Sequence, residues 1–405
     1  MTEAVIVSTA RSPIGRAKKG SLREMRPDDL AVLMVRAALD KVPAVQATDI
    51  DDLMLGCAQP SGESGYNMAR AVAVLAGFDS VPGTTVNRYC SSSLQTTRMA
   101  FHAIKAGEGD VFVSAGVETV SRYFKGGADG MPGTENPVFA QANARTQVFA
   151  EGGHDWVDPR EYGEVPDLYT AMGYTAENVA QYMKVSRREQ DEFAALSHNR
   201  AQDAIANGFW TRDITPVTLA DGTIVAQDDG PRTGVTADSI AHLETIFRPG
   251  GTVTAGNCCP LNDGAAAVVI MSDTKASQLG LTPLARIVAT GVTGLSPEIM
   301  GLGPIEATRM ALSRAALTID DIDLVEINEA FAAQVIPSAR ELSIDAERLN
   351  VNGGAIAIGH PFGMTGARIT STLVNSLQFH DKQFGLETMC VGGGQGMAMI
   401  IERLS

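Results

Sequence analysis

Three residues that could act as nucleophile, acid or base lie in glycine- or serine-rich stretches that each follow a predicted strand. Cys90 lies in TTVNRYCSSSLQT (84–96), His360 in VNGGAIAIGHPFGMTGAR (351–368) and Cys390 in LETMCVGGGQGMA (386–398). In α/β folds ligands bind at the carboxyl ends of the strands, so we expect these side chains to converge there. The start of a helix favours the thiolate form of a cysteine, and a helix is predicted directly after Cys90.

These residue types favour acyl transfer between thiols. A thiolate beside a histidine can attack a carbonyl carbon, and exchanging one thioester for another is nearly isoenergetic. A second thiol, with an unperturbed pKa of about 8.5, could carry a proton to and from carbon. Each residue also has an ordinary interpretation, Cys90 as a small buried side chain and His360 as a structural histidine.

The common cofactor and hydrolase motifs are missing from the sequence. It contains no GxxxxGK[ST] loop, no GxGxxG after a strand, no HExxH, no GxSxG and no CxxC, and its six histidines are scattered. Phosphate-loop, dinucleotide, zinc-protease and serine-hydrolase functions therefore lose their main support. We expect no metal and no permanently bound cofactor.

Short apolar strands alternate with amphipathic helices at both ends of the chain, which predicts an α/β fold with crossover connections. In the first part, the pattern predicts strands at 4–8, 53–58, 83–87 and 111–115, and helices at 28–39, 67–76 and 92–106. Near the end it predicts a helix at 305–316 and another from Thr365. TIDDIDLVEINEAF echoes ATDIDDLMLG, and FGLETMCVGGGQG echoes AGEGDVFVSAGVE, so we expect an internal duplication of one α/β unit.

The middle of the chain, from about 122 to 250, is rich in turns and poor in strand signals. Two helices are predicted in it, at 175–184 and at 186–207. Ser186 and Glu189 form a capping box for the second helix, and Gly208 is placed to end it. We therefore expect a first half at 1–121 that 251–276 completes, an inserted loop domain at 122–250, and a second half at 277–405.

Composition limits the partners. Of 405 residues, 32 are Lys or Arg and 47 are Asp or Glu, which gives a net charge of −15. Nucleic acids and anionic membranes bind basic faces, so we expect neither as a partner. No apolar run approaches the roughly 18 residues of a membrane span. Five cysteines do not make a secreted disulfide framework, and we expect a cytoplasmic protein with reduced thiols.

Six blocks, in order along the chain, resemble the thiolases (acetyl-CoA acyltransferases), and the resemblance covers essentially the whole length. They are VNRYCSSSL around Cys90, GTVTAGNCCPLNDGAAAVV (251–269), MGLGP (300–304), NEAFAAQ (328–334), GGAIAIGHPFGMTGAR (353–368) and CVGGGQGMA (390–398). The resemblance implies two similar α/β halves in a layered α/β/α/β/α arrangement. It also implies an inserted loop domain that binds coenzyme A, and a homodimer or homotetramer.

The resemblance also implies a role for each matching residue. Cys90 would be the nucleophile that becomes acylated, and His360 would accept its proton. Cys390 would be the acid and base for the acetyl carbon. Asn328 would hold a water that forms one oxyanion hole with His360, and the N–H groups of Cys90 and Gly392 would form the other. The residues that would line the coenzyme A and acyl pockets are Met172, Arg232, Phe247, Ala255, Cys259, Met300 and Phe331.

The implied reaction is a ping-pong cleavage of a 3-ketoacyl-CoA by coenzyme A, or the reverse Claisen condensation, through an acyl group on Cys90. Coenzyme A and acyl-CoA would be substrates. Arg187, Arg188 and Arg232 are the cationic candidates for its phosphates. Three alternatives remain open: a condensing synthase of the same fold, a non-catalytic relative that binds acyl-CoA or lipid, and a metal or redox role for Cys258 and Cys259.

The sequence departs from the family pattern at three places. Ser93 stands where the family usually has a glycine. Cys258, Cys259 and Pro260 replace Ala-Ser-Gly or Ser-Ser, and Ala171 stands where many short-chain members have a histidine. The alanine at position 171 puts a substrate limited to acetoacetyl-CoA in doubt and leaves room for longer acyl chains.

Overall fold

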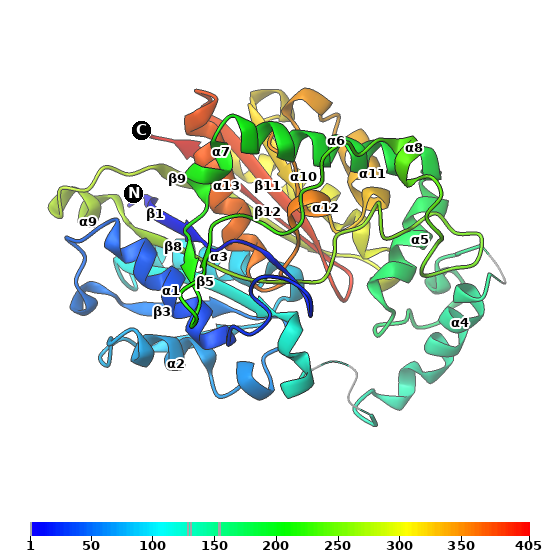
Figure 1. The fold of residues 1–405 in the computed structure, drawn as a ribbon, viewed down its shortest axis with the longest axis horizontal. Helices are drawn as coiled ribbons and strands as arrows, with labels where there is room; N and C mark the ends of the chain where they lie inside the picture. Colours follow the sequence, from blue (N-terminus) through cyan, green and yellow to red (C-terminus); the bar gives the residue numbers. More distant parts are fainter. Residues whose placement is uncertain (1, 128, 130–131, 153–154) are drawn as a thin grey trace.

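A long mixed sheet runs through the molecule (Figure 1). The computed structural model describes residues 2–127, 129, 132–152 and 155–405. The strand order is β10-β11-β12-β9-β1-β8-β5-β3-β4, and β2 pairs with β8 at one side. The strands are β1 Ala4–Arg11, β2 Gly15–Arg16, β3 Asp52–Gly56, β4 Gly83–Val86, β5 Val111–Thr119, β8 Asn262–Ser272, β9 Ala285–Gly294, β10 Leu324–Ile327, β11 Phe384–Val391 and β12 Gln395–Arg403.

The sheet repeats one pattern twice. In the first half, β4, β3 and β5 are parallel neighbours, and β8 and then β1 follow as antiparallel strands. In the second half, a bridge at Leu349, β10 and β11 are parallel, and β12 and then β9 follow antiparallel. The chain is thus two similar α/β halves, as the echoes in the sequence predicted. The halves meet where β1 pairs with β9 over two residue pairs.

Helices cover both faces of each half. Every residue of β8 is buried, as expected for a strand with helices on both sides. The helices α1 Pro27–Asp40 and α2 Met68–Leu75 pack on the first half, and α10 Gly303–Ala315 packs on the second, with α11 Ala332–Glu341 beside it.

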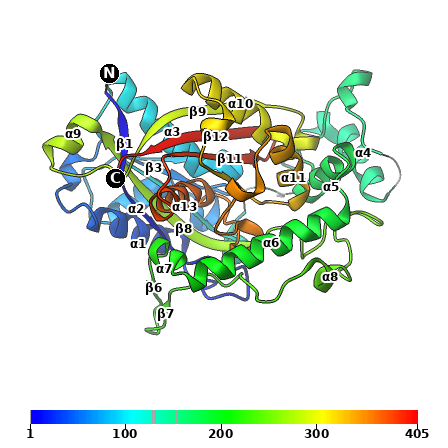
Figure 2. The same cartoon turned by 90° about the horizontal axis from the view of Figure 1, so that it is seen from above.

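Two helices fill the centre, α3 Ser92–Ala106 and α13 Thr365–Phe379. In Figure 2, α13 lies between β8 and β11. The two helices contact each other closely at Gly366. A Cβ at this position would lie only 2.1 Å from the backbone nitrogen of Leu94, so the contact requires glycine. The central core around them mixes apolar side chains of both halves, such as Ile6, Leu373 and Met397. The loops that hold Cys90 and His360 lead into these two helices.

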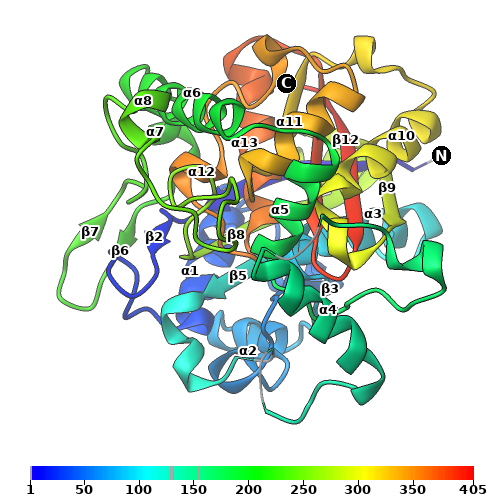
Figure 3. The same ribbon diagram turned by 90° about the vertical axis from the view of Figure 1, so that its right-hand side faces the viewer.

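The segment between β5 and β8 forms a largely helical insertion, of which α4 and α5 lie at the near side in Figure 3. The capping box of Ser186 and Glu189 is confirmed at the start of α6. Within the described residues, no helix is long and apolar enough to cross a membrane. The insertion contains α4 Ala140–Ala150, α5 Met172–Tyr182, α6 Arg187–Ala206, α7 Phe209–Asp213, α8 Ala237–Ile240 and a hairpin of β6 Val217–Thr218 with β7 Ile224–Val225; α9 Asp273–Gln278 and α12 Ala355–Ile358 lie outside it.

Candidate active site

Cys90 lies in a sharp turn between β4 and α3. Tyr89 begins this turn with φ at 43°, a left-handed conformation that is rare for a residue with a side chain. The Ser92 hydroxyl closes the turn, since its oxygen accepts the N–H of Arg88 and its O–H donates to the carbonyl of Tyr89. The turn therefore presents the thiol at the start of α3, where the sequence placed it.

The Cys90 thiol is held in its neutral form. Burial raises its pKa to about 12, although the N–H groups of Gly392 and of Cys90 itself donate toward the sulfur and lower it. The expectation that the start of the helix would favour a thiolate was wrong for the unliganded site. Only 8% of the residue is exposed, and loss of solvation outweighs two N–H donors. These two donors are nevertheless the ones predicted for an oxyanion hole.

His360 is oriented by the helix that follows it. Its Nδ1 lies 2.6 Å from Oγ1 of Thr365, and that hydroxyl donates its own proton to the carbonyl of Pro361. Nδ1 therefore carries the imidazole proton, and Nε2 presents a lone pair. Burial, with the cation of Arg368 as a smaller cause, lowers the pKa of His360 to about 3. The resting ring is thus a neutral base.

Asn328 lies beside this base, after β10. Its Nδ2 is 3.3 Å from Nε2 of His360, so the amide donates toward the lone pair. Its Oδ1 is buried and accepts no hydrogen bond from the described residues. Asn328 therefore offers one donor and one open acceptor next to His360.

Cys390 is the last residue but one of β11 and is fully buried. Burial raises the pKa of its thiol, and the nearby thiol of Cys90 raises it further. Its sulfur lies 3.4 Å from the side-chain amide of Gln334. The thiol of Cys259 interacts with both Cys90 and Cys390, so three cysteines that are far apart in the sequence lie together.

A cavity of about 320 Å³ opens onto Cys90. Gly392, a predicted oxyanion donor, and Met172, a predicted pocket residue, are in its lining. Asp129 and Gln59 form part of its rim through two mutual hydrogen bonds of 2.5 and 2.7 Å. The described lining contains no cation; it consists of Ala58, Gln59, Tyr89, Cys90, Asp129, Thr134, Glu135, Leu168, Tyr169, Thr170, Met172, Phe362, Gly392 and Gly393.

The predicted pocket residues Met300 and Phe331 form a buried apolar cluster with Cys390. Phe247 packs on it, with its ring 6.2 Å from that of Phe331 and its edge against Gly173. Cys259 continues this wall, and its N–H donates to the carbonyl of Ala330. These positions therefore lie around the candidate acid.

Arg232 lies in a separate place, beside His198 of α6 and Arg16. Its backbone N–H donates to Nδ1 of His198 at 3.3 Å. Burial lowers the pKa of Arg232, and the cation of Arg16 lowers it further. Neither arginine forms an ion pair with a described carboxylate, so together they make a cationic patch. The sequence did not single out Arg16, because one isolated arginine after RSPIG forms no recognisable motif.

The other predicted residues have different surroundings. Arg187 is paired with Asp191, and Arg188 with Glu192 and Asp238, so both charges are neutralised within α6 and its neighbour. Ala255 is exposed.

Ser93, which replaces the family glycine, accepts the N–H of Ala367 at 2.8 Å and so ties α3 to α13.

Glu118 is a further polar residue of the site that the sequence did not reveal. It is fully buried, and its Oε2 accepts the N–H groups of Ala58 at 2.8 Å and Gly363 at 2.9 Å. Burial raises its pKa. Because Ala58 lines the cavity and Gly363 follows His360 closely, Glu118 fixes the loop of the base against the wall of the cavity.

Comparison with known proteins matches both halves of the chain to family models. The model described as "Thiolase, N-terminal domain" matches residues 4–274, and "Thiolase, C-terminal domain" matches residues 281–403.

Individual relatives are similar over their full length. The 3-ketoacyl-CoA thiolase of Bacillus subtilis (strain 168) is 43% identical and aligns with 99% of this chain and 100% of its own. The 3-oxoadipyl-CoA/3-oxo-5,6-dehydrosuberyl-CoA thiolase of Escherichia coli (strain K12) is 43% identical over 100% of both chains. Among solved structures, the dimeric peroxisomal thiolase of Saccharomyces cerevisiae superposes with a TM-score of 0.88 at 34% identity, covering 99% of this chain and 97% of that one.

Proposed function

The chain belongs to the thiolase family, and from this premise we propose how its own residues carry out the reaction. The protein is an acyltransferase that cleaves 3-ketoacyl-CoA with coenzyme A to acetyl-CoA and a shortened acyl-CoA, or runs the reverse condensation. The observation that carries the assignment of residues is at Cys90. Two backbone N–H groups, one from each half of the chain, converge on this sulfur.

In the first step, Nε2 of His360 takes the proton of the Cys90 thiol. The sulfur attacks the 3-keto carbon, and the N–H groups of Cys90 and Gly392 stabilise the oxyanion that forms there. The bond between C2 and C3 then breaks, which leaves the acyl group on Cys90 and an enolate of acetyl-CoA. The protonated His360 and a water held by the open Oδ1 of Asn328 stabilise the enolate oxygen.

In the second step, Cys390 gives its proton to the enolate carbon, and acetyl-CoA leaves. The Cys390 thiolate then takes the proton of the incoming coenzyme A thiol, whose sulfur attacks the acyl-Cys90 thioester. His360 returns its proton to Cys90, and every group regains its resting form. The raised pKa of Cys390 supports this role, because the thiol enters the cycle as an acid.

Mass spectrometry of the acylated protein tests the assignment. Incubation with a 3-ketoacyl-CoA, without free coenzyme A, is expected to add one acyl mass to the peptide that contains Cys90. His360→Ala is expected to abolish the label, because the thiol then lacks its base. Acyl label on Cys258 or Cys259, with Cys90 unmodified, would show that the nucleophile is assigned wrongly.

We infer that the cavity at Cys90 receives an uncharged acyl chain. Asp129 and Glu135 line it and no described cation does, so a carboxylate at the far end of the chain would meet like charge. A volume of about 320 Å³ also exceeds what an acetyl group needs. This favours the substrates in the name of the Bacillus relative over the dicarboxylic substrate in the name of the Escherichia coli relative.

Two substrates of equal chain length separate these possibilities. We expect kcat/KM for 3-oxohexanoyl-CoA to exceed that for 3-oxoadipyl-CoA by at least about ten-fold, which corresponds to about 1.4 kcal/mol. The double variant Asp129→Asn with Glu135→Gln is expected to raise kcat/KM for 3-oxoadipyl-CoA and to leave kcat/KM for 3-oxohexanoyl-CoA unchanged. The ratio between the two substrates therefore becomes smaller. Equal rates for both substrates in the native protein would contradict the inference.

We further propose that Arg232 and Arg16 hold phosphates of coenzyme A, since the two cations lie beside each other and neither has a described carboxylate partner. The working form is proposed to be a homo-oligomer in the cytoplasm that degrades fatty acyl chains by β-oxidation. A relative whose title calls it dimeric supports the assembly, and the need for two reduced thiols supports the compartment.

A further inference from the structure

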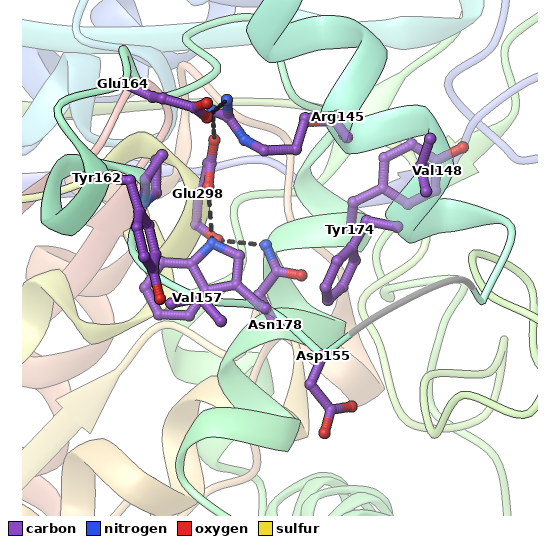
Figure 4. A pocket seen from close by; sticks show the side chains of 13 residues that line it. Arg145, Val148, Asp155, Val157, Tyr162, Glu164, Tyr174, Asn178 and Glu298 are labelled. Atoms are coloured by element: carbon purple, nitrogen blue, oxygen red, sulfur yellow. Dashed lines mark hydrogen bonds and ion pairs between the residues drawn. The ribbon is translucent and has the colours of Figure 1, made fainter.

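A second cavity, of about 280 Å³, lies within the insertion (Figure 4). It is formed by α4, α5 and the segment 155–164, with Glu298 at its base. None of the residues that we assign to catalysis or to coenzyme A lines it. The described lining is Arg145, Thr146, Val148, Phe149, Asp155, Trp156, Val157, Pro159, Tyr162, Glu164, Tyr174, Asn178 and Glu298.

Its walls are mainly apolar and aromatic. The rings of Phe149, Trp156, Tyr162 and Tyr174 surround the space, and the guanidinium of Arg248 covers the ring of Phe149 at 4.4 Å from its centroid. The mouth is open to solvent, because Tyr162 is 72% exposed and Val148 is 48% exposed. A small molecule can therefore enter and bury apolar surface.

The described wall holds one cation and three carboxylates. Arg145 forms ion pairs with Glu164 at 2.7 Å and with Glu298 at 3.2 Å. The indole N–H of Trp156 donates to the other oxygen of Glu298 at 2.7 Å. Asp155 adds a negative charge at the edge. An anionic ligand would find no unpaired cation there and would meet an excess of negative charge, so an anion is excluded. Both oxygens of Glu298 already accept from Arg145 and Trp156, so this carboxylate is not free to hold a ligand.

One polar atom is left open. Asn178 is 4% exposed, and its Nδ2 donates to the backbone carbonyl of Glu298 at 2.8 Å. Its Oδ1 is buried and has no hydrogen-bond partner among the described residues. Figure 4 shows this oxygen turned toward Tyr174. A buried acceptor without a donor is unfavourable, and a ligand that supplies an O–H or N–H removes that cost.

We propose that this cavity binds a small neutral molecule with an apolar body and one hydrogen-bond donor, such as a phenol, and that Oδ1 of Asn178 accepts the donor. A dry cavity of about 150 Å³ holds benzene. The larger volume here accommodates a substituted ring. This ligand site is separate from the cavity at Cys90 and does not depend on the roles proposed there.

Trp156 reports on occupancy directly. The chain has two tryptophans, so Trp210→Phe leaves Trp156 as the only one. We expect a saturable change in its fluorescence with 4-methylphenol. Binding of 4-methylanisole, in which a methoxy group replaces the hydroxyl and removes the donor, is expected to be about five-fold weaker, which corresponds to the loss of one neutral hydrogen bond. 4-Methylbenzoate is expected not to bind. Calorimetry on the native chain is expected to give the same order of affinities.

Three variants locate the ligand. Val148→Phe narrows the mouth and is expected to abolish binding of both neutral probes, whereas Ile224→Phe, an exposed position on β7, is expected to leave it unchanged. Asn178→Leu is expected to remove the preference for the phenol. The proposal is overturned if no probe saturates, if phenol and anisole bind equally to the native chain, or if Ile224→Phe acts like Val148→Phe. A Trp156 signal that changes with protein concentration alone would instead indicate a second copy of the chain in the cavity.

Discussion

At the scale of single residues, the three reactive groups of the site rest in their neutral forms. Burial keeps the protons on Cys90 and Cys390 and off His360. A thiolate and an imidazolium form only when a substrate brings a carbonyl to the two N–H donors at Cys90, because the developing oxyanion then supplies the missing stabilisation. The free thiol is thereby protected from reagents that attack thiolates.

Cys390→Ser tests the division of labour between the two thiols. Acyl exchange between Cys90 and an acyl-CoA moves no proton to carbon, whereas cleavage of the carbon–carbon bond does. We expect the variant to be acylated by acetyl-CoA nearly as fast as the native protein, while thiolytic cleavage falls at least about 10²-fold. Quenched-flow measurement of both half-reactions checks this. Equal loss of both would indicate that Cys390 only supports the structure.

The residues of the site were predictable from the sequence to different degrees. Cys90 and His360 lie in loops, and Cys390 lies just before one, and the composition of these three stretches singled the residues out. The direction of their pKa shifts was not predictable, because the depth of burial depends on how two halves of the chain pack. Glu118 and Thr365 gave no sequence signal, since each acts by a hydrogen bond to one particular backbone or ring atom. The assigned roles stay predictions until the half-reactions are measured.

At the scale of elements, the sequence predicted helices correctly where the helix is amphipathic or has a recognisable cap. The helix expected at 186–207 is α6, Arg187–Ala206, with its capping box formed. α4 was missed, because its buried positions are the small residues Ala142, Thr146 and Ala150, which give no apolar stripe.

The capping box of α6 gives a measurable stability effect. The Ser186 hydroxyl accepts the N–H of Glu189. Ser186→Ala removes that acceptor and is expected to lower the free energy of unfolding by about 1 kcal/mol. Ser186→Gly is the matched control, because glycine at this position costs only a few tenths of a kcal/mol. Urea denaturation of the two variants distinguishes them, and a loss of only a few tenths of a kcal/mol in Ser186→Ala would contradict the prediction.

At the scale of the whole molecule, a net charge of −15 makes the patch of Arg16 and Arg232 stand out. If this patch holds coenzyme A, the KM for coenzyme A rises with ionic strength while turnover at saturation changes little. Arg232→Ala is expected to raise this KM and flatten its dependence on salt. Arg188→Ala, at an exposed and paired arginine, is the control and is expected to change neither. An unchanged KM in Arg232→Ala would place the nucleotide elsewhere.

The position of β1 in the sheet affects the order in which the strands can pair during folding. Ala4 at the start of β1 pairs with Ser272 of β8, and Val5 pairs with Arg286 of β9. β1 therefore cannot pair until strands that follow the whole insertion in the sequence are in place. Until then, the edge of β5 that β8 covers is also unpaired. Pairing over such sequence distances is slow, and open strand edges associate with one another. We therefore expect the yield of refolding from denaturant to fall as the protein concentration rises, because aggregation competes with folding before β8 has paired with β5.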